Sequence, residues 1–116
     1  MHDDRGWIEH LDVPLGSVQR IFSKAGTTRS NHYHKTDAHT LAVVSGAMFY
    51  YERLVGSDRT TEVYVGEGQS IFTPPMMEHT TKFPVDTVLL CFSKNPRDQK
   101  SYEDDVVRTQ DLSALR

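Results

Sequence analysis

The sequence of 116 residues contains a single cysteine, Cys91, so an internal disulfide is excluded, and a buried, inert thiol is expected. No apolar run approaches the ~20 residues that a transmembrane helix needs. Residues 1–7 lack the apolar core of a signal peptide. The basic excess typical of nucleic-acid-binding proteins is also missing, because the formal net charge is −3. These absences predict a cytoplasmic protein that binds neither nucleic acid nor a membrane.

The chain is rich instead in short β-favouring runs separated by glycine, proline and serine. These runs span residues 17–23, 40–44, 47–54, 60–65, 70–73 and 87–92. No central segment shows the 3.6-residue apolar period of a long helix. The pattern therefore predicts an all-β sandwich or barrel, with residues 1–116 forming a single domain. Within it we expect a barrel core over residues 17–93 and a tail over 94–116 that is partly helical at 104–115. Pro74 and Pro75 are expected in a loop or at a strand start.

Three of the six histidines, His32, His34 and His39, fall within eight residues. Alternate side chains of an extended strand share a face, so His32 and His34 should point the same way, ~7 Å apart. Residues 35–38 are long enough for a turn that returns His39 to the same place, and His79 follows the loop that contains the two prolines. Imidazoles suit zinc, copper, iron and nickel. Taken alone, however, a His-X-His pair is more often a polar surface pair or a hydrogen-bonded one.

The spacing of these residues resembles the two sequence motifs of the cupins. The first motif is matched at every gap by Gly26, His32, His34, His39 and Gly46. The second motif is matched by Gly68, Pro74 and His79, with Met76 in place of its glycine and Phe83 in place of its asparagine. The two matches together cover half of the chain.

The resemblance implies a cupin-type double-stranded β-helix, that is, a jelly-roll barrel. It also implies one divalent transition-metal ion (Fe, Zn, Ni, Mn or Cu) inside the barrel, bound by His32, His34, His39 and His79. His39 stands where cupins usually have glutamate. The resulting set of four neutral imidazoles leaves the charge of the site equal to that of the ion, which favours an anionic ligand or hydroxide.

A narrower resemblance links the chain to cupins of nucleotide-sugar metabolism. It rests on residues 4–6 (Asp-Arg-Gly), on Glu9 and on residues 29–35, with a further similarity in the tail at residues 102–108. The families concerned are the deoxysugar 3,5-epimerases, the 3,4-ketoisomerases and the capsular-polysaccharide cupins. Ser30 stands where those families usually have glycine, and the chain is shorter than a typical epimerase.

The sugar resemblance implies an isomerase or epimerase that removes a proton beside a carbonyl group and returns it elsewhere. An imidazole is a suitable base near neutral pH, so His32 or His34 is the expected base. Tyr33 is the expected acid, with Tyr50 and Tyr51 as further candidates, although packing within a sheet is an ordinary role for each tyrosine. In the ketoisomerases, the resemblance implies that the His-X-His pair works without a metal.

Arg29, Lys35 and Tyr51 are the expected substrate-binding residues for a small molecule in the barrel, although solvated rim charges would equally explain the first two. Two alternatives remain open: a metal-dependent dioxygenase with an all-histidine site, and a non-catalytic small-molecule-binding cupin. A homodimer is also expected, because the apolar strand at 88–92 or the aromatic run at 49–51 is suited to burial against a second subunit.

Overall fold

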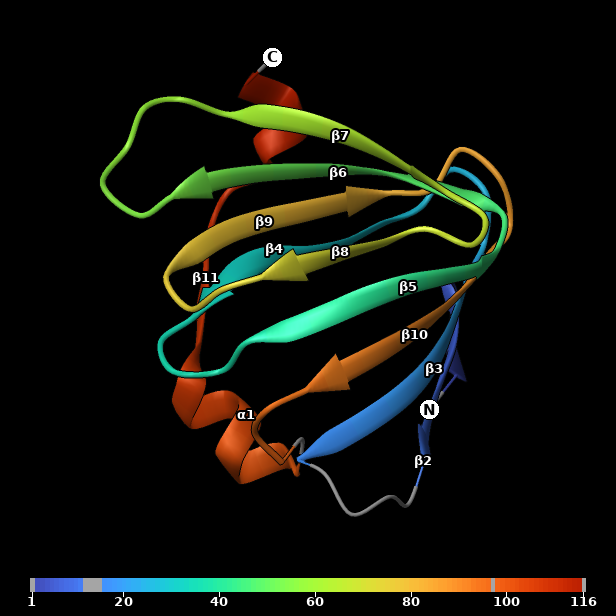
Figure 1. Ribbon diagram of the computed structural model, residues 1–116, viewed down its shortest axis with the longest axis horizontal. Helices are drawn as coiled ribbons and strands as arrows, with labels where there is room; N and C mark the ends of the chain where they lie inside the picture. Colours follow the sequence, from blue (N-terminus) through green and yellow to red (C-terminus); the bar gives the residue numbers. More distant parts are fainter. Residues whose placement is uncertain (1, 12–15, 97, 116) are drawn as a thin grey trace.

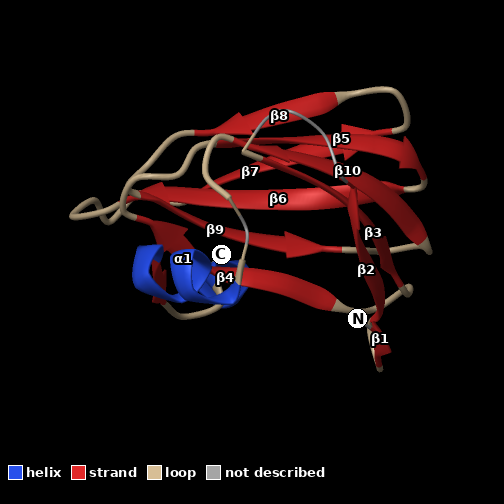
Figure 2. Ribbon diagram, turned by 90° about the horizontal axis from the view of Figure 1, so that it is seen from below, coloured by secondary structure: helices blue, strands red, loops and turns tan. Residues whose placement is uncertain are grey.

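The computed structural model describes residues 2–11, 16–96 and 98–115 and consists of two antiparallel β-sheets that face each other (Figures 1 and 2). The six-stranded sheet has the order β1 (His2–Asp3), β2 (Gly6–Leu11), β3 (Ser17–Ser23), β10 (Thr87–Ser93), β5 (His39–Ser45) and β8 (Ser70–Thr73). The five-stranded sheet has the order β11 (Val106–Arg108), β4 (Thr28–His34), β9 (Met77–Lys82), β6 (Ala47–Leu54) and β7 (Thr61–Gly66). The helices are α1 (Gln99–Asp105) and the 3-10 helix η1 (Leu112–Leu115). The predicted all-β fold is confirmed.

The six predicted strands are all present, and β3, β6 and β8 agree with the prediction at both ends. The prolines lie between β8 and β9, as expected. The tail is partly helical over 104–115, as expected, because α1 ends at Asp105 and η1 spans Leu112–Leu115. The prediction missed that α1 already begins at Gln99 and that Val106–Arg108 form strand β11, which pairs with β4. The β-branched Val106 and Val107 favour a strand, and β11 completes the edge of the five-stranded sheet.

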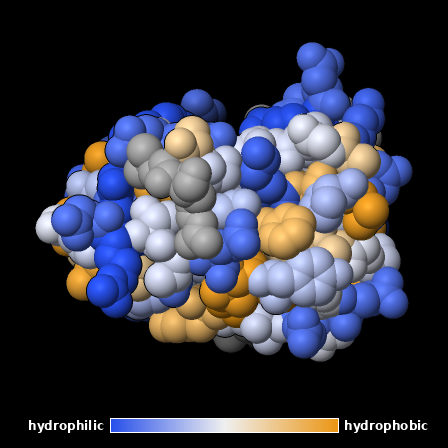
Figure 3. Space-filling view, turned by 90° about the horizontal axis from the view of Figure 1, so that it is seen from above, coloured by the Kyte–Doolittle hydropathy of each residue, from blue (hydrophilic) through white to orange (hydrophobic). Residues whose placement is uncertain are grey.

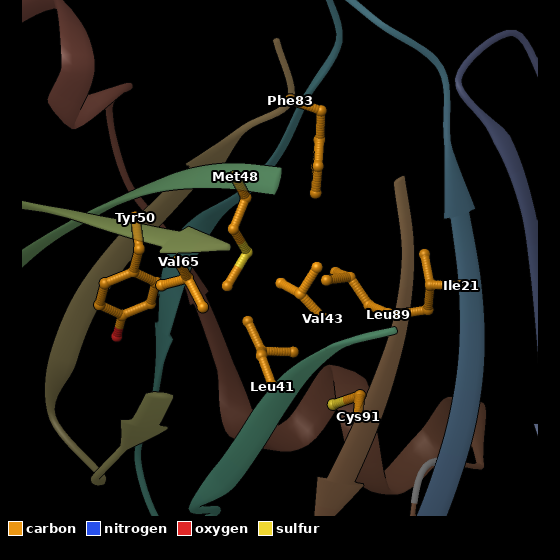
Figure 4. Packing of buried hydrophobic residues seen from close by; sticks show 9 residues of the cluster. All are labelled: Ile21, Leu41, Val43, Met48, Tyr50, Val65, Phe83, Leu89 and Cys91. Carbon is orange, nitrogen blue, oxygen red and sulfur yellow. The ribbon is translucent and has the colours of Figure 1, made fainter. Parts of the chain in front are cut away.

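The barrel interior is apolar at one end and polar at the other. The apolar part draws on both sheets (Figure 4) and contains Ile21, Leu41, Val43, Met48, Tyr50, Val65, Phe83, Leu89 and Cys91. The burial predicted for Cys91 is confirmed. Val43 pairs with Leu89 in this core, whereas four residues away on β5, His39 pairs with Ser93. The inner faces of β5 and β10 therefore extend from the apolar core to His39, one of the clustered histidines.

An irregularity in β4 determines which of its side chains face the interior. Ser30 and Asn31 have φ values of 78° and 58°, and the pairing of β4 with β9 shifts register between Ser30 and His32. Thr80 Oγ1 donates a 2.9 Å hydrogen bond to Asn31 Oδ1 across this bulge. An extra residue in a strand reverses the alternation of faces, so Arg29 and His32 are both buried. The positive φ at Ser30 explains why glycine suits this position.

Hydrophobic residues on the face of the molecule that carries β7 and η1 form small patches between hydrophilic ones (Figure 3). Scattered apolar side chains of this kind are normal for a protein surface. Within the described ranges, neither helix has the length or the apolar composition of a membrane span.

Candidate metal centre

Four histidine side chains meet at the polar end of the barrel interior. His32 and His34 come from β4, His39 from the start of β5, and His79 from β9, where it pairs directly with His32. All four residues are between 1% and 7% exposed. The ring centroids are 4.7 Å apart for His32 and His79, 5.4 Å for His34 and His39, and 5.0 Å for His39 and His79. The structure thus brings together the residues that the sequence predicts as ligands.

Two overlapping groups in this cluster have the geometry to hold a metal ion. The candidate ligand atoms of His32, His34 and His79 lie within 4.8 Å of one another, and so do those of His34, Asp37 and His39. Imidazole nitrogens with at most one carboxylate oxygen are the donors that zinc, iron, copper and nickel prefer. The residues therefore fit a divalent transition-metal ion, and His34 belongs to both groups.

Hydrogen bonds orient two of the rings. His79 Nδ1 lies 3.0 Å from the carbonyl oxygen of Met77, and His34 Nδ1 lies 3.1 Å from Asp105 Oδ2. A carbonyl or carboxylate oxygen accepts hydrogen bonds, so in both neutral rings Nδ1 carries the proton and Nε2 keeps its lone pair. His34 Nε2 is fully buried within the cluster. Outer partners of this kind set ring orientation and tautomer in metal sites.

Asp105, at the end of α1, connects the helix to the loop between β4 and β5. Its Oδ1 accepts 2.7 Å hydrogen bonds from Thr36 N and Thr36 Oγ1, and its Oδ2 accepts one of 3.1 Å from Asp37 N. Burial by itself raises the pKa of the Asp105 carboxyl. The hydrogen bonds from Thr36, Asp37 and His34 together lower this pKa by more than burial raises it, so it lies below its usual value. From the same helix, the Tyr102 ring lies 5.8 Å from that of His34. Figure 2 shows α1 beside β4.

No family model and no curated protein sequence matches the chain, but solved structures do. The capsular polysaccharide assembling protein CapF of Staphylococcus aureus aligns with a TM-score of 0.84 and 26% identity over 93% of this chain. The aligned part is 30% of the CapF chain, so this chain spans about a third of that protein. The CENP-C cupin domain of Drosophila melanogaster aligns with a TM-score of 0.60 and 15% identity, covering 74% of each chain.

The chain has a cupin fold. Its fold is also shared by QdtA, a sugar 3,4-ketoisomerase from Thermoanaerobacterium thermosaccharolyticum solved in complex with TDP. QdtA aligns with a TM-score of 0.68 and 19% identity over 82% of this cupin and 67% of its own chain.

Three other predicted site residues lie outside the histidine cluster of this cupin. Tyr33 alternates with His32 and His34 along β4, so its side chain is on the outer face of the sheet. Tyr51 pairs with Thr80 and is also on the outer face, which η1 covers. Lys35 is exposed directly after β4. None of the three side chains shares the inner face with the histidines.

Arg29 faces the interior, but its guanidinium lies away from the histidines. Arg29 Nε donates a 2.7 Å hydrogen bond to Ser23 Oγ on β3. Ser23 pairs with Thr87 at the start of β10, whereas His39 pairs with Ser93 at the end of that strand. Six residues of strand separate these two positions by about 20 Å. The structure therefore places this guanidinium at the opposite end of the barrel.

Sequence reasoning missed Asp37, Tyr102 and Asp105 at the histidine cluster. Asp37 lies in the segment that the sequence analysis treated only as a turn between His34 and His39. Tyr102 and Asp105 belong to residues 102–108, the tail segment that resembles sugar-associated cupins. That resemblance was the one signal in the sequence that pointed to α1 as part of the site.

Proposed function

We propose that this cupin binds one divalent transition-metal ion in the histidine cluster and catalyses proton transfer beside the carbonyl group of a nucleotide-linked sugar, as an isomerase or epimerase. The observation that carries the proposal is the buried group of His32, His34 and His79, whose ligand atoms lie within 4.8 Å of one another. The similarity to CapF over 93% of this chain supports carbohydrate chemistry, as does the fold shared with a ketoisomerase that was solved with TDP.

The residues of the site are suited to this reaction. A divalent ion bound by these imidazoles supplies Lewis-acid polarisation of the substrate's carbonyl oxygen. His79 and His34 are held by Met77 and Asp105 in the tautomer that directs the Nε2 lone pair away from these partners. The apolar core on the other side of the cluster limits the entry of water, which strengthens electrostatic interactions within the site. Proton transfer also requires a base within reach of the substrate carbon.

The proposal can be tested on protein purified without an affinity tag. Metal content is measured first, and the protein is then incubated in deuterium oxide with a TDP-linked 4-keto sugar. We expect nearly one metal ion per chain. We also expect proton NMR to show loss of the substrate hydrogen beside the carbonyl group, and this loss should disappear after chelation and return when metal is added.

Two outcomes would contradict the proposal in different ways. Exchange that persists in metal-free protein would show that the histidines act as acid and base without an ion. Protein that binds metal and TDP but exchanges no substrate hydrogen would be a binding cupin rather than an isomerase.

We also propose that two copies of this cupin associate through the outer face of the six-stranded sheet. Val44, Phe72 and Phe92 are 52%, 58% and 39% exposed on this sheet. Phe72 and Phe92 both pair with Thr40, so they lie in one row on one face. Exposed apolar patches mark protein contacts, and one patch used twice gives a closed dimer. The aromatic run at 49–51 is less suitable, because its two tyrosines are buried.

We expect light scattering to give twice the chain mass for the wild type and the monomer mass for Phe72→Glu, which places a charge in the proposed interface. Tyr64→Glu is the matched control, because Tyr64 is also 58% exposed but lies on β7 of the other sheet. The dimer proposal is wrong if the wild-type protein has the mass of a monomer, or if only Tyr64→Glu dissociates it.

A further inference from the structure

The carboxylate of Glu52 faces the barrel interior from β6. Met48 and Tyr50 are the preceding residues of the same parity on this strand, and both belong to the buried core (Figure 4). Phe49 has the opposite parity, and its ring packs on the ring of Tyr64. Because side chains alternate along a strand, Glu52 shares the inner face with Met48 and Tyr50. It is only partly buried, unlike Met48 and Tyr50, so part of this residue is accessible to solvent.

The register of the five-stranded sheet places Glu52 beside the histidine cluster. Glu52 pairs with His79, and His79 pairs with His32 on its other side. The three residues thus form one row across β6, β9 and β4. The Cβ atoms of directly opposite residues are about 4.5–5.5 Å apart, so the Glu52 side chain extends next to the His79 ring.

Tyr50 connects Glu52 to the buried part of the site. Its hydroxyl lies 2.6 Å from Thr73 Oγ1, and its ring lies parallel to that of His79 at a centroid distance of 6.2 Å. Burial is the largest cause that raises the pKa of the Tyr50 hydroxyl. The hydrogen bond with Thr73 lowers this pKa, whereas the negative charge of Glu52 raises it. A phenol that burial keeps neutral can donate a hydrogen bond to a neighbouring carboxylate.

The neighbouring carboxylates have other roles. Glu78, on β9, receives two 3.1 Å hydrogen bonds from the guanidinium of Arg53. Asp105 accepts hydrogen bonds from the loop that carries Asp37. Among the described residues, Glu52 belongs to neither of the two groups with metal-binding geometry. Glu52 is thus an inward-facing carboxylate that lies next to the histidine cluster but is not one of the candidate metal ligands.

We propose that Glu52 is the general base of the reaction, a role that rests on the proposed function. A Glu52 carboxylate oxygen accepts the proton from the substrate carbon beside the keto group. The electron pair of the broken C–H bond forms a carbon–carbon double bond, and the carbonyl π pair moves onto the carbonyl oxygen. In an epimerisation, solvent protonates the same carbon on its opposite face, the carbonyl group re-forms, and Glu52 releases its proton to solvent. In an isomerisation, the hydroxyl group on the deprotonated carbon passes its proton to the enolate oxygen and becomes the new carbonyl group, while Glu52 returns its proton to the former carbonyl carbon. No oxidant or further reactant is required.

The test compares Glu52→Gln and Glu52→Asp with wild type in the deuterium exchange assay on a TDP-linked 4-keto sugar. Glu62→Gln is the matched control, because Glu62 pairs with Tyr51 and is an exposed carboxylate on the outer face. General bases contribute roughly 10²–10⁴-fold to rate, so we expect kcat for exchange to fall by about that factor in Glu52→Gln. Glu52→Asp should recover part of it. Metal content, TDP affinity by calorimetry and KM should remain at wild-type values.

The outcomes separate this assignment from the proposed function. If wild type exchanges the substrate hydrogen and Glu52→Gln does so within threefold of it, Glu52 is not the base, while the proposed function stands. If Glu52→Gln loses metal or TDP binding together with exchange, its role is structural and the assignment is wrong. If metal-loaded wild type exchanges no hydrogen, the proposed function fails, and the assignment of Glu52 fails with it.

Discussion

The variant His34→Ala is expected to lose stoichiometric binding of a divalent transition metal. His34 belongs to both groups of candidate ligands, so its removal leaves each group with two members. Changes to outer partners of a metal ligand typically cost about 10- to 100-fold in affinity, and removal of a shared ligand should cost more. Metal content by mass spectrometry and competition with a chromogenic chelator would measure the loss.

His32→Ala and His39→Ala identify which group holds the ion. If the ion is held by His32, His34 and His79, His39→Ala should retain it. If it is held by His34, Asp37 and His39, His32→Ala should retain it. A site of four histidines would be weakened by both substitutions. Thr81→Val is the folding control, because Thr81 is buried and lies two residues from His79 on the same strand. Full metal occupancy in His34→Ala would contradict the proposed centre.

The positions of His32, His34 and His39 could be predicted because they depend on local rules, whereas His79 was assigned to the site by the resemblance to the second cupin motif. Strand alternation puts His32 and His34 on one face, and a short loop returns the chain to His39. The β1–β2 segment was not predicted, because its first strand has only two residues and β2 is placed by long-range pairing with β3. Strand β11 has three residues and exists as a strand because it pairs with β4. Local sequence carries little information about such pairing.

The orientations of the other candidate residues could not be predicted, because they depend on register. Tyr50 and Tyr51 are adjacent in the aromatic run, and sequence alone does not determine which faces the interior. The structure places Tyr50 in the core and Tyr51 on the outer face. A shift of one residue exchanges the two faces of a strand. The bulge at Ser30 produces such a shift within β4, so Arg29 and His32 are both buried although they are an odd number of positions apart.

The variant Asp105→Asn is expected to lose both stability and metal affinity. In Asp105→Asn, an amide that can accept through only one oxygen replaces a carboxylate that accepts from His34 Nδ1, Thr36 and Asp37. Leaving a buried donor unsatisfied costs about 1–3 kcal/mol, so we expect the free energy of unfolding of the metal-free protein to fall by about that amount. Because the substitution also removes the acceptor that orients the His34 ring, metal affinity should fall by roughly 10- to 100-fold.

The adjacent variant Asp104→Asn separates this local effect from a general loss of negative charge. Asp104 is on the same helix, is exposed, and forms a 3.0 Å ion pair with Lys100, also an exposed residue. Exposed pairs of this kind contribute at most about 1 kcal/mol, so urea unfolding and chelator competition should both give values close to wild type. If the two substitutions reduce metal affinity equally, α1 contributes to metal binding through its negative charge and not through the hydrogen bond to His34. A loss confined to Asp105→Asn would make α1 a structural part of the metal centre, because it would show that the ring of a β4 histidine is positioned by a carboxylate more than 70 residues away in the chain.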